Sequence, residues 1–268
     1  MGVFDRLAEL EREGRPAALA TVVRDRGSVP RRAGTRMIIL RDGRTEGTIG
    51  GGEMEARVVQ EARQAIHEQR PRLLHYSFSD PGEGDPGVCG GEIEVFVEPL
   101  GLRPTLVVVG GGHVGRAVAY LASWLGFRLI VSDDRPEYCT PEAVPGADQY
   151  VQCALSELAE RIAADENTHW VLTTRGVSLD VEGLPAVLAR PAAFIGVIGS
   201  RKRWETTRKE LIDKGVPAED LGRVTSPIGL ELNAETPEEI AVSILAQIIQ
   251  QRRQGSGEPM ARLARPSA

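Results

Sequence analysis

The chain has 268 residues, enough for one large or two ordinary domains with a well-developed hydrophobic core. It carries 32 basic and 38 acidic residues, a net charge of −6, and this acidic balance excludes the class of general nucleic-acid binders. Three widely spaced cysteines, an N-terminus unlike a secretory signal and no apolar run of membrane-spanning length predict a cytoplasmic protein without a disulfide framework.

Residues 1–100 have the pattern of an α+β domain with antiparallel hairpins. Apolar residues at helical spacing predict a short helix that begins at Val3 and ends before Gly14, and a second helix over residues 53–66. Apolar runs bounded by turn residues predict strands. The strands expected here are residues 17–23, 35–40, a return through 47–49 after an Asp42-Gly43 turn, 73–78 and 92–98.

The pattern changes near residues 100–104, where Pro99, Gly101 and Pro104 interrupt the chain. Strands then alternate with helices, which indicates a parallel sheet with crossover helices. The strands expected are residues 106–109, 128–131, 150–151, 169–173, 193–198 and 223–225. The last helix is expected to start after Thr236 with a capping box. We therefore predict an α/β fold class, with an N-terminal α+β domain over 1–100, a Rossmann-like domain over 104–250 and a disordered tail over 251–268.

A G-x-G-x-x-G segment connects the first predicted strand of the second domain to a helix. Gly110 permits a tight turn, Gly112 lets the backbone approach a pyrophosphate, and Gly115 lets the helix pack on the strand. Asp133 and Asp134 follow the next strand at about the expected spacing of 20 residues, where an acid accepts hydrogen bonds from ribose hydroxyls. The segment predicts a nucleotide-binding cleft, and glycines that only tighten the turn are the alternative.

Two other glycine turns precede predicted helices. For Gly50-Gly51-Gly52, taken alone, a hairpin or helix cap is the favoured interpretation, although its amides could receive a charged cofactor. In Gly199-Ser200-Arg201, which continues into Lys202 and Arg203, cations stand at the positive end of a helix dipole. Because cations are disfavoured there, the second turn favours an anionic ligand or partner.

Cys89 is the cysteine with an unusual setting, because Gly90 and Gly91 follow it and leave it uncrowded. Its thiolate could be reached by a metal, a sulfur donor or an oxidant, and a small buried residue is the alternative. Cys139 and Cys153 are interpreted as packing residues. The four histidines have no metal-ligand spacing, and no hydrolase motif is present, so neither a zinc site nor a hydrolase is predicted.

These segments occur with others in a definite order along the chain. They are Gly27-Ser28-Val29-Pro30-Arg31, Gly47-Thr48-Ile49-Gly50-Gly51-Gly52-Glu53-Met54-Glu55-Ala56, Val88-Cys89-Gly90-Gly91, Val109-Gly110-Gly111-Gly112-His113-Val114-Gly115, Asp133-Asp134-Arg135-Pro136-Glu137, Ile195-Gly196-Val197-Ile198-Gly199-Ser200-Arg201, Pro227-Ile228-Gly229-Leu230 and Thr236-Pro237-Glu238-Glu239. From about residue 18 to residue 249, the chain resembles the xanthine dehydrogenase accessory protein family of the XdhC/CoxI type.

The resemblance implies a maturation factor for molybdenum hydroxylases. Such a factor binds the molybdenum cofactor (molybdopterin or its dinucleotide form), supports its sulfuration with a cysteine desulfurase and delivers it to the apo-enzyme, usually as a homodimer. The implied cofactor-binding residues are Gly50, Gly51, Gly52, Cys89, Gly90, Gly91, Gly110, Gly112, His113, Gly115, Asp133, Asp134, Arg135, Gly199, Ser200 and Arg201, with Cys89 also a contact for molybdenum or sulfur.

The chain departs from the family pattern in two places. The family often has histidines where this chain reads Thr174-Arg175-Gly176-Val177-Ser178-Leu179-Asp180, so a role for those histidines does not carry over. Glu53 stands where some relatives have a second cysteine. The sequence leaves two other functions open: an NAD(H)-dependent oxidoreductase, which the fingerprint and Asp133 would also serve, and a nucleotide-sensing regulator.

Overall fold

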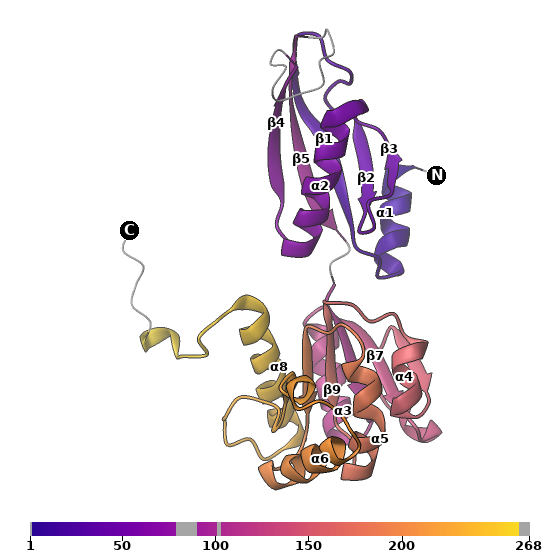
Figure 1. The fold of residues 1–268 in the computed structure, drawn as a ribbon, viewed down its shortest axis with the longest axis vertical. Coiled ribbons are helices and arrows are strands. Elements are labelled where there is room, and N and C mark those ends of the chain that lie inside the picture. The colour runs from indigo at the N-terminus through magenta and orange to yellow at the C-terminus, as the bar shows by residue number, and fades with distance from the viewer. Residues whose placement is uncertain (1, 79–89, 101–102, 263–268) are drawn as a thin grey trace. The chain divides into compact units, whose positions relative to one another are not determined.

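The computed structural model describes residues 2–78, 90–100 and 103–262. The chain divides into two compact units, Met1–Arg103 and Pro104–Ala268, and each is described by itself (Figure 1). The predicted α/β fold class, an antiparallel sheet followed by a parallel Rossmann-like sheet, is confirmed. Among the described residues, no helix combines the length and apolar character that a membrane crossing requires.

The first unit is a five-stranded antiparallel sheet with a helix on each face. Its elements are α1 (Val3–Arg12), β1 (Ala17–Arg26), β2 (Arg36–Leu40), β3 (Thr45–Gly47), α2 (Gly52–Glu68), β4 (Arg72–Ser77) and β5 (Glu92–Leu100), with strand order β3-β2-β1-β5-β4. Successive side chains of β1 point to opposite faces. Ala18 therefore packs in the α2 cluster, whereas Leu19 packs in the cluster of Leu10 from α1.

For two strands of the first unit, the hydrogen bonds explain the departure from the predicted bounds. β1 continues to Arg26 because a register shift between Val22 and Arg24 lets its pairing with β5 persist to Glu92. β3 starts at Thr45, before the predicted return at residue 47, because the turn is tight: the Gly43 amide donates to the Leu40 carbonyl at 2.9 Å.

The second unit is a six-stranded parallel sheet with helices on both faces. Its elements are β6 (Thr105–Val109), α3 (His113–Trp124), β7 (Arg128–Asp133), β8 (Gln149–Gln152), α4 (Leu155–Arg161), β9 (Thr168–Leu172), α5 (Val177–Leu188), β10 (Phe194–Val197), α6 (Arg201–Asp213), α7 (Ala218–Leu221), β11 (Val224–Thr225) and α8 (Pro237–Arg253), with 3-10 turns at Pro136–Tyr138 and Met260–Arg262. The helix α8 therefore covers the first three residues of the segment expected to be a disordered tail.

The parallel sheet is buried on both faces, as its continuous apolar strands require. Leu106 and Val108 of β6 pack in one cluster with α3 and α8, while Val107 and Val109 pack in another with α4, α5 and α6. The strand order is β11-β10-β9-β6-β7-β8, so the chain changes direction across the sheet between β6 and β9. Ligands of open α/β sheets bind outside the carboxyl ends of the strands at such a switch point.

Candidate functional site

The glycine loop at the switch point is closely packed on one side and open on the other. Gly110 has a φ of +103°, and a Cβ added there would lie 2.7 Å from the Thr173 carbonyl oxygen. A Cβ at Gly115 would lie 1.7 Å from the Gly110 carbonyl oxygen, so α3 packs directly on the turn. A Cβ at Gly112 would meet no atom within 4 Å. The loop therefore offers its open backbone at Gly112, where α3 begins.

The G-x-G-x-x-G fingerprint allows any residue at position 111, so the sequence does not predict that Gly111 is required. A Cβ there would lie 1.9 Å from the Tyr138 carbonyl oxygen. The Gly111 amide also donates to Asp133 Oδ2 at 2.9 Å, so the loop is held against the end of β7. Only glycine fits between these two contacts.

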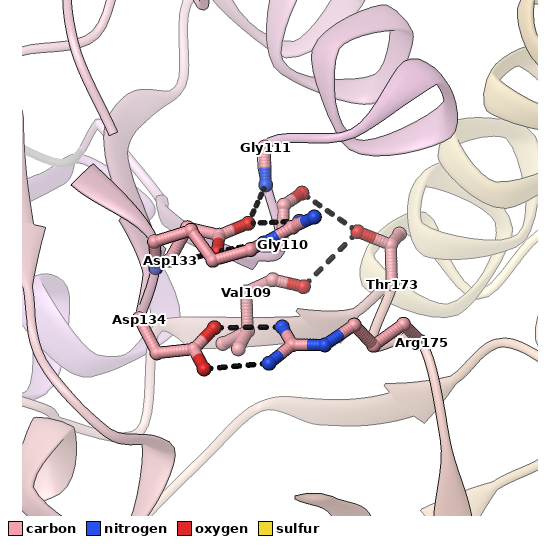
Figure 2. Close-up of polar contacts among 8 residues, drawn as sticks. Val109, Gly110, Gly111, Asp133, Asp134, Thr173 and Arg175 are labelled. Carbon is pink, nitrogen blue, oxygen red and sulfur yellow. Dashed lines mark hydrogen bonds and ion pairs between the residues drawn. The ribbon is translucent and has the colours of Figure 1, made fainter. Parts of the chain in front are cut away.

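Asp133 uses its carboxylate entirely within the chain (Figure 2). Oδ1 accepts from the amide and Nε of Arg135, each at 3.0 Å, and Oδ2 accepts from Gly111 and from Arg135 Nη2 at 3.0 Å. A carboxylate has about four acceptor sites, and the residue is only 3% exposed. The predicted hydrogen bond from a ribose hydroxyl therefore finds no vacant acceptor on Asp133, which acts as a brace for the glycine loop.

Asp134 forms a two-pronged ion pair with Arg175, whose Nη1 and Nη2 each lie 2.7 Å from a carboxylate oxygen. Asp134 follows β7 and Arg175 follows β9, and these strands flank β6, so the pair crosses the end of β6 next to the glycine loop (Figure 2). The hydrogen bond from Arg175 holds the pKa of Asp134 far below its ordinary range. Both side chains remain partly exposed, at 38% and 49%.

A cavity of about 380 Å³ opens at this edge of the sheet. It collects the predicted residues Gly110, Gly112, His113, Asp133, Asp134 and Arg135. Its other lining residues are Val109, Ser132, Tyr138, Cys153, Ala154, Leu155, Ser156, Thr173, Thr174, Arg175, Leu179 and Glu182. The volume lies within the range of small-molecule sites, and polar groups of both charges converge on it. Gly115 lies behind the loop and serves its packing.

Two cysteines of the second unit lie near this cavity. Cys153 packs against the hydrophobic cluster of the second unit, as the sequence predicts, and also lines the cavity, with its Sγ 4.0 Å from Ser132 Oγ. Cys139 is buried, and its thiol donates to the Val131 carbonyl oxygen at 3.6 Å. Burial raises the pKa of both thiols, so neither is an activated thiolate at neutral pH.

One of the three cations that follow the turn at Gly199, Arg203, pairs with a carboxylate of the same unit. Ser200 caps α6, since its Oγ accepts from the Arg203 amide at 3.2 Å. The Arg203 guanidinium turns back toward Asp180 of α5, with Nη2 2.6 Å from Oδ2, and also donates to the Thr174 carbonyl and hydroxyl oxygens. The expectation that Arg203 serves an external anion is therefore corrected: its partner is Asp180.

Asp180 is fully buried, and its second carboxylate oxygen accepts from the Thr174 hydroxyl. Burial raises the pKa of Asp180 despite the opposing hydrogen bonds from Thr174 and Arg203. The segment 174–180, which departs from the family pattern, thus supplies Thr174 and Asp180 to a buried polar network with Arg203. Gly199, Ser200 and Arg201 do not belong to the lining of the cavity, and the side chains of Arg201 and Lys202 are exposed.

In the first unit, the Gly50-Gly51-Gly52 turn also carries an internal carboxylate. All three glycines have positive φ. Glu55 Oε2 accepts from the Thr48 hydroxyl at 2.6 Å, from the Ile49 amide at 3.1 Å and from the Gly51 amide at 3.0 Å. Burial opposes ionisation of Glu55, but these hydrogen bonds outweigh it and lower the pKa of the carboxyl. Of the amides expected to receive a charged cofactor, that of Gly51 is therefore occupied by Glu55, and that of Gly50 donates to the Thr48 hydroxyl at 3.1 Å.

Gly90 and Gly91 lie against the loop that follows β1. Gly90 forms an isolated bridge with Ser28, and a Cβ at Gly91 would lie 2.2 Å from the Ser28 carbonyl oxygen. These glycines serve a close approach of two backbone segments. Cys89, the predicted contact for molybdenum or sulfur, lies outside the described residues. Within the described ranges, no group of three or more His, Cys, Asp or Glu side chains is arranged to hold a metal ion.

Comparison with curated proteins and solved structures places these features in a family. A model of the XdhC Rossmann domain matches residues 106–248, and a model of the XdhC and CoxI family matches residues 10–77. The chain is 36% identical, over its whole length, to the uncharacterized protein YqeB of Escherichia coli, and 33% identical over 59% of its length to a probable xanthine dehydrogenase subunit of Bacillus subtilis. It spans 49% and 46% of these two relatives, about half of their length.

Two further similarities cover most of the chain. The molybdenum cofactor insertion chaperone PaoD of Escherichia coli is 24% identical over 88% of this chain and 83% of its own length. A solved structure of a xanthine dehydrogenase from Bacillus halodurans has a TM-score of 0.50, with 23% identity and coverage of 98% of both chains, and shows the fold alone. Since the matched family ranges cover more than half of the sequence, the chain belongs to the XdhC and CoxI family.

Proposed function

We propose that the chain is a maturation factor that binds the molybdenum cofactor, as molybdopterin or its dinucleotide form, and delivers it to an apo molybdenum hydroxylase. The observation that carries this proposal is the similarity to the insertion chaperone PaoD, which extends over 88% of the chain and therefore through both units. The similarity to a probable xanthine dehydrogenase subunit supports the same class of client enzyme.

The cavity of the second unit supports this cargo by its position and chemistry. It lies at the switch point of a parallel sheet, where phosphorylated ligands bind in this fold class. Gly112 leaves room for a pyrophosphate or phosphate to approach the backbone, and Arg135 and Arg175 supply cations. A volume of about 380 Å³ suits part of a pterin nucleotide, with the remainder outside the opening.

The geometry of Asp133 removes one support, the ribose contact from Asp133, for the NAD(H)-dependent oxidoreductase that the fingerprint left open. A ribose-binding acid needs a vacant acceptor, but all four acceptor sites of Asp133 are used by Arg135 and Gly111. Asp134, the other acid at the end of β7, is partly exposed and pairs with Arg175. Phosphate binding beside Gly112 does not require a ribose contact from Asp133.

The proposal includes finer steps that follow from the family resemblance. They are sulfuration of the cofactor with a cysteine desulfurase, a contact from Cys89 to molybdenum or sulfur, a homodimeric assembly and a cytoplasmic location. The change Cys89→Ala tests the second of these. We expect it to retain the pterin but to lower the share of hydroxylase that becomes active, because the proposed sulfuration step would lose its cysteine contact. Equal activation by wild type and variant would remove Cys89 from this role.

Delivery is tested with a purified apo hydroxylase. The chain is loaded anaerobically from a cofactor-rich extract, separated from free cofactor and mixed with the apo-enzyme. We expect hydroxylase activity to appear in proportion to the loaded chain. A chain taken through the same steps with an extract from cells unable to make the cofactor is the control. Activation that is no greater with the loaded chain than with this control would overturn the proposal.

A further inference from the structure

The Asp134–Arg175 ion pair crosses the carboxyl end of β6, and both side chains line the cavity. The strand order places β6 between β7 and β9, so this pair joins the two segments on either side of the loop (Figure 2). A ligand that approaches the open backbone at Gly112 thus meets a cation already matched with a carboxylate. The pair has the two parallel N–H to oxygen bonds that a guanidinium also makes with a phosphate.

The second arginine of the cavity is held much more firmly. The Arg135 guanidinium donates from both Nε and Nη2 to Asp133, which is almost fully buried. It also lies over the Tyr138 ring at 3.8 Å from the centroid. Release of Arg135 would strand a buried carboxylate without its cation, which is costly. Arg135 is therefore a fixed part of the wall.

Arg175 differs because its partner is accessible to water. Asp134 is 38% exposed and Arg175 is 49% exposed. Exposed ion pairs contribute about 0–1 kcal/mol, because water solvates both groups when they separate. An incoming phosphate can therefore compete with Asp134 for Arg175, while Asp134 turns to solvent without leaving a buried charge.

We propose that Arg175 is the anion-binding residue of this cavity, and that a phosphate or pyrophosphate group of the ligand replaces Asp134 on its guanidinium. The inference rests on the proposed function for the identity of the whole ligand, but its anion chemistry is testable alone. Before the ligand arrives, Asp134 keeps the Arg175 guanidinium oriented across the end of β6. After exchange, the same guanidinium bonds two phosphate oxygens beside Gly112. Asp134 thus repels weakly bound anions and selects ligands with enough negative charge to displace it.

The test measures binding of inorganic pyrophosphate by calorimetry at low salt. Asp134→Asn removes the competing charge and should tighten binding by about 3- to 10-fold. Arg175→Gln removes the cation and should weaken binding by about 10-fold or more. Arg175→Gln in the Asp134→Asn background should cancel the gain. Asp42→Asn is the matched control, because Asp42 pairs with Arg44 in the first unit at 2.7 Å and is also exposed.

Pyrophosphate binding by Asp134→Asn no tighter than by wild type would overturn the inference, as would binding by Arg175→Gln equal to wild type. A gain with Asp42→Asn as large as that with Asp134→Asn would overturn it too, since net charge alone would explain both. Tryptophan fluorescence checks that each variant is folded. A chain that binds pyrophosphate through Arg175 yet never activates an apo hydroxylase would refute the proposed function and leave this inference standing.

Discussion

Gly111 and Gly112 are neighbours in one turn, but a side chain at Gly111 would overlap the backbone, whereas one at Gly112 would enter open space. We expect Gly111→Ala to destabilise the second unit by at least about 1–3 kcal/mol, because its Cβ would overlap the Tyr138 carbonyl oxygen. Gly112→Ala should change stability by no more than about 0.5 kcal/mol, because its Cβ enters open space. Urea denaturation followed by tryptophan fluorescence measures both, since Trp124, Trp170 and Trp204 all lie in the second unit. Equal losses in the two variants would contradict this account of the loop.

His169 gives the second unit a dependence on pH. Burial, followed by the nearby Arg252 cation, lowers the pKa of His169 to about 4. Its Nδ1 lies 3.0 Å from the Asn167 carbonyl oxygen, so the neutral ring carries its proton on Nδ1. Among the described residues, the buried Nε2 has no hydrogen-bond partner. A proton added at Nε2 would therefore place a charge in the core without an acceptor.

The sign of this effect follows from proton binding. Between pH 6.5 and about 4 the unfolded chain binds a proton at residue 169 and the folded chain does not, so stability falls as pH falls through this window. The loss from this group should reach about 3 kcal/mol at pH 4. Urea denaturation at pH 7 and pH 5 measures it. His169→Leu should flatten the dependence relative to wild type, and an exposed His67→Gln should leave it unchanged. A slope unaffected by His169→Leu would refute the assignment.

The network of Thr174, Asp180 and Arg203 joins the end of β9 to the helices α5 and α6. Asp180→Ala would leave the partly buried Arg203 guanidinium without its carboxylate, and removal of one partner of a buried pair costs about 3–5 kcal/mol. We expect a loss of this size in urea denaturation. The double change Asp180→Ala with Arg203→Met should recover part of it, because no charge is then left unpaired.

The control for this network is the exposed Glu157–Arg161 pair of α4. Glu157→Ala should cost about 0.3–0.5 kcal/mol, since a solvated pair one helical turn apart contributes little. If Asp180→Ala costs no more than Glu157→Ala, the network does not stabilise the unit. If the double change is as unstable as the sum of its single changes, the two side chains are not coupled.

The elements themselves were largely predictable, because periodicity and turn residues are local signals. The capping box of Thr236 and Glu239 fixes the start of α8, and the glycine spacing places a strand, a turn and α3 in order. The internal partners were not predictable. Glu55 accepts a hydrogen bond from the Gly51 amide, and Asp133 accepts one from the Gly111 amide. Asp180 pairs with the guanidinium of Arg203, which is 23 residues away in the sequence. The short-range contacts of Glu55 depend on the conformation of its loop, and the long-range pairs of Asp133 with Gly111 and Asp180 with Arg203 have no periodic signal. Cys153 joins the cavity only through the order of the strands.

At the scale of the whole molecule, we propose that residues 104–268 fold without the first unit. Within the described part of the chain, the hydrophobic clusters of the second unit draw on residues between 106 and 248, and those of the first unit on residues between 3 and 100. The fragment 104–268 should therefore unfold cooperatively, with a tryptophan-detected midpoint within a few degrees of the full chain. A fragment without a cooperative transition would contradict this division.

The central claim is that the cavity beside Gly112 holds the cargo, and its most direct test is the pterin and molybdenum content of the anaerobically purified full chain. Gly112→Val fills the open side of the loop without meeting protein atoms at its Cβ, whereas Ala189→Val places the same side chain at the exposed end of α5. We predict that wild type and Ala189→Val retain both pterin and molybdenum, and that Gly112→Val, still folded, loses most of each. Wild type without pterin, or Gly112→Val with as much pterin as wild type, would contradict the account.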